Sequence, residues 1–322
     1  MDHLDLSVII VNWNTKDLLL RCLESLRVDL NDTDQWHLLP DGRPLSFEVL
    51  VVDNASTDGS ADMVAARFPQ VRLLANETNA GFTKANNQAI SLSQGQYVIL
   101  LNSDAEIVGQ AMETMVTYLD DHPEIGVVGP KLLNTDGSVQ SSHRRFPTLA
   151  TGFVESTILQ RYFPRSRLLS RYYCLDLPAD REQDVDWVVG ACLMVRRTAI
   201  AEVGLLDDDF FMYSEELDWC WRIKKAGWKV AFLASAEVVH HYGKSSERDL
   251  PQRHIYFNDS KLKLYRKHFG LPAATALRLF ILATYVFQVL EEGLKFLLGH
   301  KRPLRKERLG LLLRVLRSGL QA

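Results

Sequence analysis

The sequence predicts an α/β fold, with a doubly wound, parallel sheet in its first part and a helical extension at its end. Short, continuously apolar runs rich in β-branched residues are typical of strands buried on both faces of a parallel sheet. Each run is followed by a polar turn and then by apolar residues at helical spacing, and such alternation predicts right-handed crossovers. The four runs span residues 6–11, 47–52, 71–74 and 97–101.

Composition and charge predict a globular protein with an unusual basic tail. The chain has 322 residues, of which 47% are hydrophobic and 24% charged, and its net charge is −3. Residues 244–322 carry 16 Lys and Arg against 6 Asp and Glu, so the rest of the chain is strongly acidic. The four cysteines show no CxxC spacing, which favours a reducing cytosol. An acidic N-terminus that enters a strand almost at once predicts no signal peptide.

The first strand, 6–11, ends in the polar turn Asn12-Trp13-Asn14-Thr15, and a helix follows with Asn14 or Thr15 as its cap. Residues 28–46 lack periodicity and are predicted to form a surface loop. The second strand ends at Asp53, and its helix runs through Phe68. The third strand leads through Gly81 into a helix that ends near Ser93 and carries Lys84 and Asn86, and the fourth ends at Asn102-Ser103-Asp104.

The ends of these strands predict a nucleotide site. Ligands of such sheets bind beyond the carboxyl ends of the strands, which here carry Trp13, Asp53 and Asp104. An aromatic plane can stack on a base, one carboxylate can accept hydrogen bonds from the base or ribose, and another can hold a cation on phosphates. Because the glycine motifs of dinucleotide and P-loop sites are absent, we expect a cation to neutralise the phosphates.

The middle of the chain is less regular. Residues 127–132 are predicted to form a strand, and 185–195 a buried strand in which Gly190-Ala191 permits close approach of a ligand or backbone. Segment 140–184, which contains Arg145, is either an acceptor loop or an ordinary basic surface loop.

The stretch Phe210–Arg222 places carboxylates beside an apolar wall. Ser214 is suited to cap a helix that has Glu215 and Glu216 in its first turn, and Asp218 can pair with Arg222 four residues on. The two carboxylates in the first turn either complement the helix dipole or act in catalysis.

The tail is predicted to form three helices, at about 251–269, 272–298 and 303–319. In the second, only the 12 residues 279–290 are without formal charge, fewer than the roughly 20 that a bilayer requires. In the third, Leu309, Leu313, Leu316 and Leu320 lie opposite Arg314 and Arg317, a pattern of interfacial helices. The tail therefore packs on the body, builds a dimer or lies on a membrane.

Seven strings in order give the chain a family resemblance that covers about residues 5–246. They are VIIVNWNT, VVDNASTDGS, NAGFTKANNQAI, LLNSDAEI, VVGACLMVRR, FFMYSEELDWCWR and VVHHYGKSS. In this order they resemble family-two glycosyltransferases, especially bacterial rhamnosyltransferase-like members. The resemblance implies a GT-A fold with a mixed central sheet, a nucleotide-diphosphate sugar donor, a divalent metal and inversion. It implies a domain at 1–246, with a Rossmann-like donor half at about 1–105 and an acceptor half at about 106–246, before the basic amphipathic tail 247–322.

The resemblance also implies roles for individual residues. Asp104 and His240 would bind Mg²⁺ or Mn²⁺, with His241 a less favoured neighbour, and Asn102 replaces the first Asp of the family's D-x-D element. Glu216 would be the catalytic base, with Glu215 as the alternative. A helix N-terminus lowers the pKa of a carboxylate, which disfavours a base, but an apolar wall can offset this by desolvation. Donor-binding residues would be Trp13, Asn14, Asp53, Gly81, Lys84, Asn86, Asn102 and Ser103, and acceptor-side residues would be Gly190, Ala191, Asp218 and Arg145.

The resulting hypothesis is a metal-dependent, inverting glycosyltransferase on the inner face of the cell membrane. The resemblance favours transfer of L-rhamnose from dTDP-rhamnose to a saccharide or polyprenyl-linked saccharide in cell-surface polysaccharide synthesis, with an anionic membrane surface and a homodimer as partners. The alternatives are a UDP-hexose donor, a sugar nucleotidyltransferase, and a membrane-tethered module that binds nucleotide sugars without turnover. No nucleic-acid partner is expected.

Overall fold

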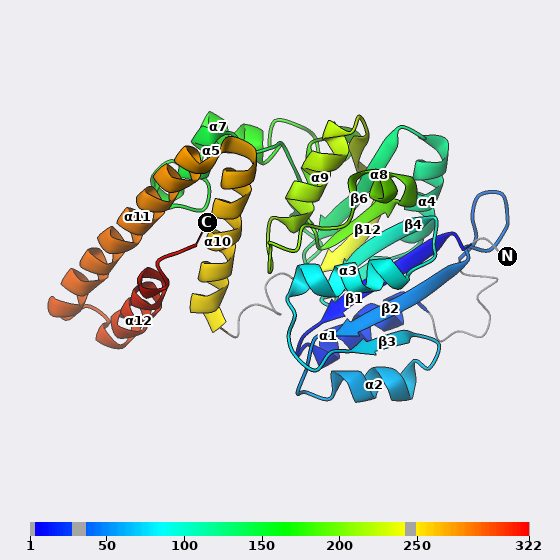
Figure 1. Ribbon diagram of the computed structural model, residues 1–322, viewed down its shortest axis with the longest axis horizontal. Coiled ribbons are helices and arrows are strands. Elements are labelled where there is room, and N and C mark those ends of the chain that lie inside the picture. The colour runs from blue at the N-terminus through cyan, green and yellow to red at the C-terminus, as the bar shows by residue number, and fades with distance from the viewer. Residues whose placement is uncertain (1–3, 28–36, 242–248, 322) are drawn as a thin grey trace. The chain divides into compact units, whose positions relative to one another are not determined.

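The computed structural model describes residues 4–27, 37–241 and 249–321 (Figure 1). The chain divides into two compact units. Unit 1 comprises Met1–Phe146, Tyr173–Asp208 and Glu215–Ser245, and unit 2 comprises Pro147–Tyr172, Asp209–Ser214 and Ser246–Ala322. Unit 2 therefore adds two internal segments to the basic tail.

Unit 1 is built on a ten-stranded sheet with the main strand order β3-β2-β1-β4-β11-β6-β12-β5. The sheet is mixed, as the family resemblance implied. The strands β1 to β4 pair in parallel, whereas β11 runs antiparallel to β4 and β6. The main strands are β1 (Leu6–Asn12), β2 (Phe47–Asp53), β3 (Arg72–Ala75), β4 (Tyr97–Asn102), β5 (Ala105–Val108), β6 (Ile125–Leu133), β11 (Cys192–Arg196) and β12 (Lys229–His240). Two short strands lie off this path: β7 (Val139–Gln140) pairs with β6, and β9 (Gln183–Val185) pairs with β12. A second sheet consists of β8 (His143–Arg144) and β10 (Trp187–Val188).

The prediction of a single strand at 185–195 is wrong. The run divides into β10 and β11 because its two halves pair with different partners, β8 in the small sheet and β4 in the main sheet. Residues 189–191 form the break between them. This break brings Gly190 and Ala191 to the end of β4, where the Asn102 amide donates to the Ala191 carbonyl oxygen at 2.9 Å.

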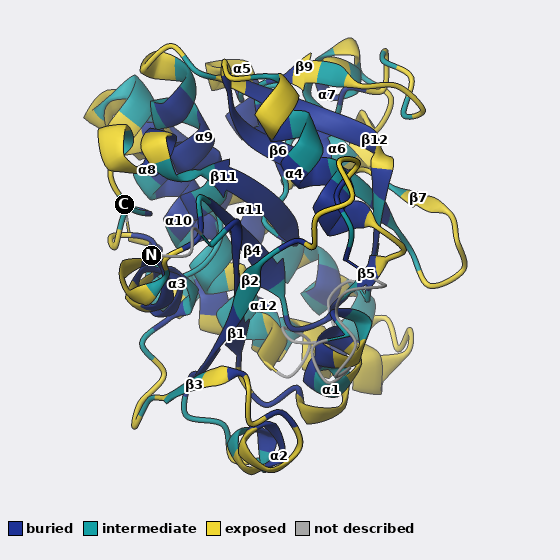
Figure 2. Cartoon of the chain, turned by 90° about the vertical axis from the view of Figure 1, so that its right-hand side faces the viewer, coloured by how far each residue is buried: buried dark blue, intermediate teal, exposed yellow. Residues whose placement is uncertain are grey.

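Helices cover the sheet of unit 1, and the strands between them are buried (Figure 2). Val8 and Ile10 of β1 share one apolar core with Leu23 and Met115 from two of these helices. The helices are α1 (Lys16–Ser25), α2 (Ser60–Arg67), α3 (Phe82–Leu92), α4 (Ala111–Asp121), α8 (Arg197–Val203) and α9 (Glu215–Lys225). Thr15 is the N-cap residue of α1, as predicted, but its hydroxyl donates to Asn12 Oδ1 and forms no capping hydrogen bond.

The predicted surface loop at 28–46 is described only from His37 onward, since 28–36 lie outside the described residues. The described part is anchored rather than free on the surface. Leu39 and Leu45 are buried, and Arg43 donates to the Asp5 carboxylate at 2.8 Å.

Unit 2 consists of helices, and its three long ones lie within two residues of their predicted bounds. They are α10 (Leu250–Phe269), α11 (Leu271–Leu297) and α12 (Arg302–Ser318), preceded in the chain by α5 (Leu149–Val154), α6 (Ile158–Tyr162) and α7 (Arg167–Tyr172). Among the described residues, α11 is the one helix long and apolar enough to cross a membrane by length and composition. The apolar stretch of α11 is longer than the uncharged residues 279–290, because it continues past a charged residue.

The internal segments join unit 2 through contacts with α10. Tyr265 donates from its hydroxyl to the Thr148 carbonyl oxygen at 2.8 Å, and the buried Lys261 ammonium donates to the Glu155 carboxylate at 3.2 Å. Ser260 donates to the Met212 carbonyl oxygen at 2.7 Å. The segment 209–214, which leads directly into α9, is therefore held by α10.

The long helices of unit 2 form their own core, which includes Leu262, Leu277, Ile281, Leu312 and Val315. The leucines that the sequence analysis aligned on one side of the last helix differ in burial, because Leu320 lies in this core whereas Leu313 is 37% exposed. The sequence has three consecutive leucines at 311–313, so periodicity alone does not decide which of them is buried. Packing against the other helices of unit 2 places Leu312 in the core.

A buried ion pair joins α11 to α12. Arg305 Nη1 lies 2.7 Å from Glu292 Oε2, and both residues are buried. Removing one partner of a buried pair leaves an uncompensated charge, so we expect Glu292→Ala to lower the free energy of unfolding of unit 2 by about 3 kcal/mol. Circular dichroism during urea unfolding measures this loss. The exposed Glu307 is the control, and equal stabilities of Glu292→Ala and Glu307→Ala would contradict the assignment.

Candidate functional site

Parallel pairing brings three strand ends to one edge of the unit 1 sheet. Asn12 at the end of β1 is in register with Asp53 of β2, and Val11 is in register with Asn102 of β4. The turns that follow these strands are therefore neighbours, as the sequence predicted from its alternating strands and helices.

The first turn exposes an aromatic side chain on a fixed backbone. Trp13 is 41% exposed, which is unusual for a tryptophan beside a buried strand. The next residue, Asn14, has a left-handed backbone with φ 55°, and its side-chain oxygen accepts from the Thr57 amide at 2.7 Å. The turn after β1 is thus tied to the turn after β2. Trp13 presents a surface on which a flat ring can stack.

Asp53 organises this pair of turns. It is only 3% exposed, and its two oxygens accept from Asn12 Nδ2 and from the Ser56 amide, both at 2.9 Å. The carboxylate thus holds the turn after β2, and a hydrogen bond to a base would use the remaining lone pairs of these oxygens.

The turn before α3 depends on a residue that the sequence analysis did not select. Asn54 donates to Asn79 Oδ1 at 2.9 Å and to the Gly81 carbonyl oxygen at 3.1 Å, and it accepts from the Ala80 amide at 3.0 Å. Its position directly after Asp53 at a strand end was the available signal. Gly81 has φ 89°, a conformation that favours glycine.

The other predicted donor residues of α3 differ in exposure. Lys84 is exposed, whereas Asn86 is 1% exposed and donates to the Phe82 carbonyl oxygen of its own helix at 2.9 Å. Lys84 is therefore accessible to a ligand, and Asn86 lies inside unit 1.

The end of β4 contains an unsatisfied acceptor. The side-chain oxygen of Asn102 is buried and has no hydrogen-bond partner among the described residues. The neighbouring Ser103 hydroxyl lies 2.9 Å from the Thr15 hydroxyl. A buried acceptor without a partner costs free energy, so Asn102 is positioned to accept from a bound group.

Asp104 and His240, 136 positions apart in the chain, come together because β5 and β12 pair antiparallel with His240 in register with Ala105. Asp104 Oδ1 lies 3.3 Å from His240 Nε2, and both residues are buried. Gln140 Oε1, which can only accept, lies 2.7 Å from His240 Nδ1, so the imidazole proton sits on Nδ1. In the neutral imidazole, Nε2 then directs a lone pair toward Asp104.

Positive charge between these two atoms stabilises the contact, and either a proton on Nε2 or a bound cation supplies it. Adjacent ligands of an octahedral cation, each at about 2.1 Å from it, lie about 3 Å apart, and this spacing fits the pair. Carboxylate oxygen and imidazole nitrogen are suitable ligands for Mn²⁺. Among residues 4–27, 37–241 and 249–321, no group of three or more His, Cys, Asp or Glu could hold a metal. A cation here would therefore need further ligands from the donor or from water.

Helix α9 begins at Glu215 and places two carboxylates in its first turn, as predicted. Ser214 has a left-handed φ of 65°, in contrast to the extended backbone typical of an N-cap residue. Glu216 Oε1 accepts from the Gly190 amide at 3.3 Å, and one oxygen of each glutamate is buried without a hydrogen-bond partner.

Burial raises the pKa of both glutamates. Loss of hydration is the main cause for each, and repulsion between the two carboxylates raises the pKa of Glu215 further. Hydrogen bonds from backbone amides and the Arg144 charge oppose the increase at Glu216 without cancelling it. Desolvation thus outweighs the effect of the helix N-terminus, so this carboxylate has the character of a proton acceptor.

Residues 7–204 match the model of the family described as "Glycosyl transferase family 2". The chain belongs to this family. The N-acetylglucosaminyl-diphospho-decaprenol L-rhamnosyltransferase of Mycobacterium tuberculosis is 35% identical over 224 residues, which cover 66% of this chain and 71% of that protein. The O-antigen biosynthesis protein RfbC of Myxococcus xanthus is 27% identical over 69% of this chain and 17% of its own length.

Solved structures of glycosyltransferases share the fold. The mannosyltransferase PcManGT from Pyrobaculum calidifontis, in complex with GDP-Man and Mn²⁺, superposes with a TM-score of 0.54 at 16% identity, covering 99% of this chain and 87% of that one. GalNAc-T7 with UDP, GalNAc and Mn²⁺ gives a TM-score of 0.57 at 15% identity and covers 82% of this chain, which spans 48% of that protein. These similarities confirm the GT-A fold of the glycosyltransferase.

The residues predicted on the acceptor side of this glycosyltransferase fall into two groups. Gly190 and Ala191 lie beside Glu216 and Asn102, as described above. Arg145 is partly exposed and binds Asp176 at 2.7 Å. Asp218, in contrast, is 0% exposed and accepts from Arg222 at 2.9 Å, which confirms the predicted i, i+4 pair but places this carboxylate in the protein interior. Asp218 therefore has no exposed surface, and its place on the acceptor side stays a prediction.

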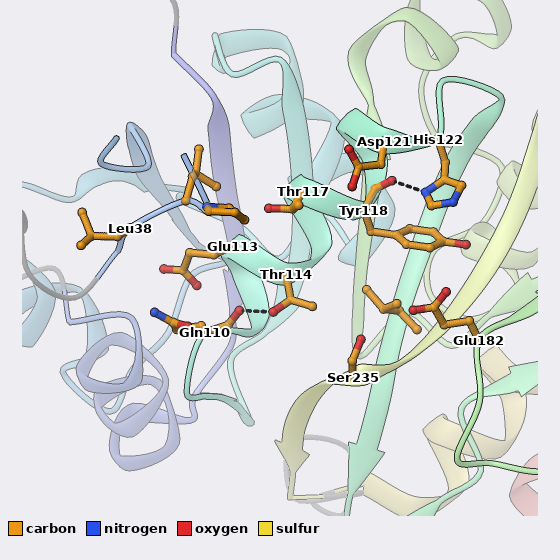
Figure 3. Close-up of a pocket in the computed structure, with 13 residues that line it drawn as sticks. Leu38, Gln110, Glu113, Thr114, Thr117, Tyr118, Asp121, His122, Glu182 and Ser235 are labelled. Carbon is orange, nitrogen blue, oxygen red and sulfur yellow. Dashed lines mark hydrogen bonds between the residues drawn. The ribbon is translucent and has the colours of Figure 1, made fainter. Parts of the chain in front are cut away.

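A cavity of about 590 Å³ lies elsewhere in unit 1, beside α4 and β12 (Figure 3). Its wall includes Thr117, Tyr118, Glu182 and Ser235, none of which is a predicted site residue. The cavity is therefore separate from the strand-end site of the glycosyltransferase.

Proposed function

We propose that this glycosyltransferase moves L-rhamnose from dTDP-rhamnose to a lipid-linked saccharide in cell-surface polysaccharide synthesis, with inversion. The observation that carries this proposal is the 35% identity to the mycobacterial rhamnosyltransferase, whose name specifies a diphospho-decaprenol acceptor. The geometry of the strand-end site supports it, because an exposed aromatic, a carboxylate and imidazole pair and a desolvated carboxylate meet the needs of sugar transfer.

The donor would lie along the strand ends. Trp13 would stack on the base, while Asn14 and Asp53 hold the turns that orient it. Lys84, exposed on α3, would approach the diphosphate, and the unsatisfied oxygen of Asn102 would accept from a donor hydroxyl. Gly81, Asn86 and Ser103 would shape the pocket from behind through the contacts described above.

Asp104 and His240 would hold a divalent cation, Mn²⁺ or Mg²⁺. When bound, the cation supplies positive charge that stabilises the diphosphate as it leaves. Gln140 keeps His240 in the tautomer that directs Nε2 toward Asp104. Manganese accompanies the donor nucleotide in two structures of similar fold.

Glu216 would take the proton from the acceptor hydroxyl as this oxygen attacks the sugar carbon. Its raised pKa matches this task better than that of an ordinary glutamate. The Gly190 amide donates to one carboxylate oxygen of Glu216, and the loss of hydration is the main cause of the raised pKa of this residue. Arg145 would contact the acceptor. A lipid-linked acceptor would place the enzyme on the inner, anionic face of the cell membrane, where a homodimer could form.

A panel of donors tests the proposal. With Mn²⁺ and a polyprenyl-diphospho-N-acetylglucosamine acceptor, we expect dTDP-rhamnose to give a product larger by one deoxyhexose, measured by mass spectrometry. UDP-glucose and UDP-galactose should give little product. Exclusive use of a UDP-hexose would contradict the assignment of dTDP-rhamnose as the donor. Release of pyrophosphate would indicate a nucleotidyltransferase, and donor binding without any product would indicate a binding module.

A further inference from the structure

Helix α11 exposes a continuous apolar face. Its members lie at steps of seven, one, three, four and three residues, which keep them on one side of an α-helix. We call the following six residues the outer face of α11: Leu279 (62% exposed), Val286 (48%), Phe287 (49%), Leu290 (68%), Leu294 (59%) and Leu297 (74%).

The opposite side of α11 is already occupied. Leu277, Ile281 and Tyr285 are buried in the core of unit 2, which α11 shares with α10 and α12 (Figure 1). The outer face therefore contributes nothing to that core. A contiguous exposed apolar surface of this kind marks an interaction site.

The unit that carries the outer face is basic. Unit 2 contains 19 Lys and Arg against 8 Asp and Glu, whereas the whole chain has a net charge of −3. The N-terminal end of α12 exposes Lys301, Arg302 and Lys306, a short distance along the chain from Leu297 and Leu298. Apolar side chains next to basic ones are complementary to a surface of anionic lipid.

A second segment of unit 2 adds aromatic residues beside α11. Arg161 Nη1 lies 3.5 Å from Glu291 Oε2, which places the end of α6 next to the helix one residue beyond Leu290. The following Tyr162 and Phe163 are 57% and 60% exposed. Exposed aromatic rings of this kind are enriched at the boundary between lipid and water.

We propose that the outer face of α11, with Tyr162, Phe163 and the basic N-terminal end of α12, lies on an anionic lipid surface. This inference rests on the membrane location proposed above and assigns it to particular side chains. Leucines and rings enter the boundary between headgroups and acyl chains, while the lysines and arginines contact lipid phosphates. The enzyme is thereby held where a lipid-linked acceptor is presented.

The contacts of α11 argue against a helix that spans the bilayer. The Tyr285 hydroxyl lies 3.1 Å from His254 Nδ1 and accepts from Asn258 at 3.2 Å, and Glu292 binds Arg305. Spanning would separate these polar groups from the partners that satisfy them inside unit 2. The basic N-terminal end of α12 argues against a second copy of the chain on the outer face, because two such basic groups would repel each other.

Vesicle binding of the full-length chain tests the proposal, with vesicles of phosphatidylcholine alone or with added phosphatidylglycerol. We expect Leu290→Gln with Leu294→Gln to lower the partition coefficient about tenfold or more. The triple variant Lys301→Gln, Arg302→Gln, Lys306→Gln should lower it about 100-fold on anionic vesicles only. These side chains are exposed, so the variants should fold, which circular dichroism checks. The controls in unit 1 are Leu175→Gln, at an exposed leucine, and the triple variant Arg21→Gln, Arg72→Gln, Lys225→Gln.

The outcomes separate the alternatives. Losses in both test variants with wild-type binding in both controls support the proposal, and activity on a water-soluble acceptor should stay unchanged. Equal binding of wild-type and Leu290/Leu294 proteins would overturn it. A lower mass in ultracentrifugation without a change in vesicle binding would indicate a dimer surface, and resistance to alkaline carbonate extraction would indicate a spanning helix. Vesicle binding by a protein that transfers no sugar would refute the proposed function and leave the lipid surface intact.

Discussion

Glu216→Gln is expected to lower kcat by about 10²–10⁴-fold while donor affinity stays unchanged. The substitution keeps the size of the side chain and its contact with the Gly190 amide, but glutamine cannot take a proton from the acceptor hydroxyl. Steady-state kinetics and calorimetry with the donor measure the two effects separately. Loss of donor affinity equal to the loss of kcat would contradict the assignment of Glu216 to the acceptor side.

Glu215→Gln is the matched control. Glu216 can accept a proton only when it is ionised, so kcat should fall as the pH drops through the pKa of Glu216. Burial raises this pKa, so the fall in kcat should occur at a higher pH than for an ordinary glutamate. Loss of hydration raises the pKa of Glu216, and the charge of Glu215 is not among the causes, so the fall should stay at the same pH in Glu215→Gln. If Glu215→Gln loses turnover and Glu216→Gln keeps it, the base is Glu215.

Asp104→Ala is expected to weaken metal-dependent donor binding by about 100-fold or more, because the substitution removes a carboxylate ligand of the cation. His240→Ala should weaken it less, since the ligand it removes is uncharged. Gln140→Leu should cost about tenfold by releasing the imidazole from its fixed tautomer. Calorimetry of dTDP binding with and without Mn²⁺ measures all three.

Glu106→Ala provides the control for this series. Glu106 lies two residues from Asp104, and its carboxylate lies 2.6 Å from the His241 imidazole. The two residues form a second carboxylate and imidazole pair. Its loss should leave donor affinity near that of the wild type. A larger effect at Glu106 than at Asp104 would move the cation to the Glu106 and His241 pair.

Much of the fold could be predicted because fully buried parallel strands have a simple signature. Strands β1 and β4 are uninterrupted apolar runs, and both were predicted to within one residue at their ends. The three long helices of unit 2 could be predicted equally well, because amphipathic spacing that continues over many residues is typical of a helix. Residues 185–195 were wrongly predicted to form one strand. They divide into β10 and β11 because these strands pair with β8 and β4, and local periodicity does not show which strands pair.

In the site, too, residues marked by the local sequence could be predicted, whereas contacts that depend on strand pairing could not. Trp13 and Asp104 could be selected locally, because each follows an apolar strand. The pairing of Asp104 with His240 depends on the register of β5 and β12, which the residues alone did not predict, and the family resemblance supplied it. Asn54 was missed because its contribution is a set of hydrogen bonds to the turn before α3. The acceptor side was predicted to include Asp218, but this residue is 0% exposed and its carboxylate pairs with Arg222.

Anomalous diffraction at the manganese edge, from crystals grown with Mn²⁺ and dTDP, tests the central claim most directly. We expect one strong peak between Asp104 Oδ1 and His240 Nε2, the atoms that lie 3.3 Å apart, with the diphosphate on its open side and the base against Trp13. A nucleotide bound at the strand ends with manganese at Glu106 and His241, or with no manganese peak at all, would contradict the assignment.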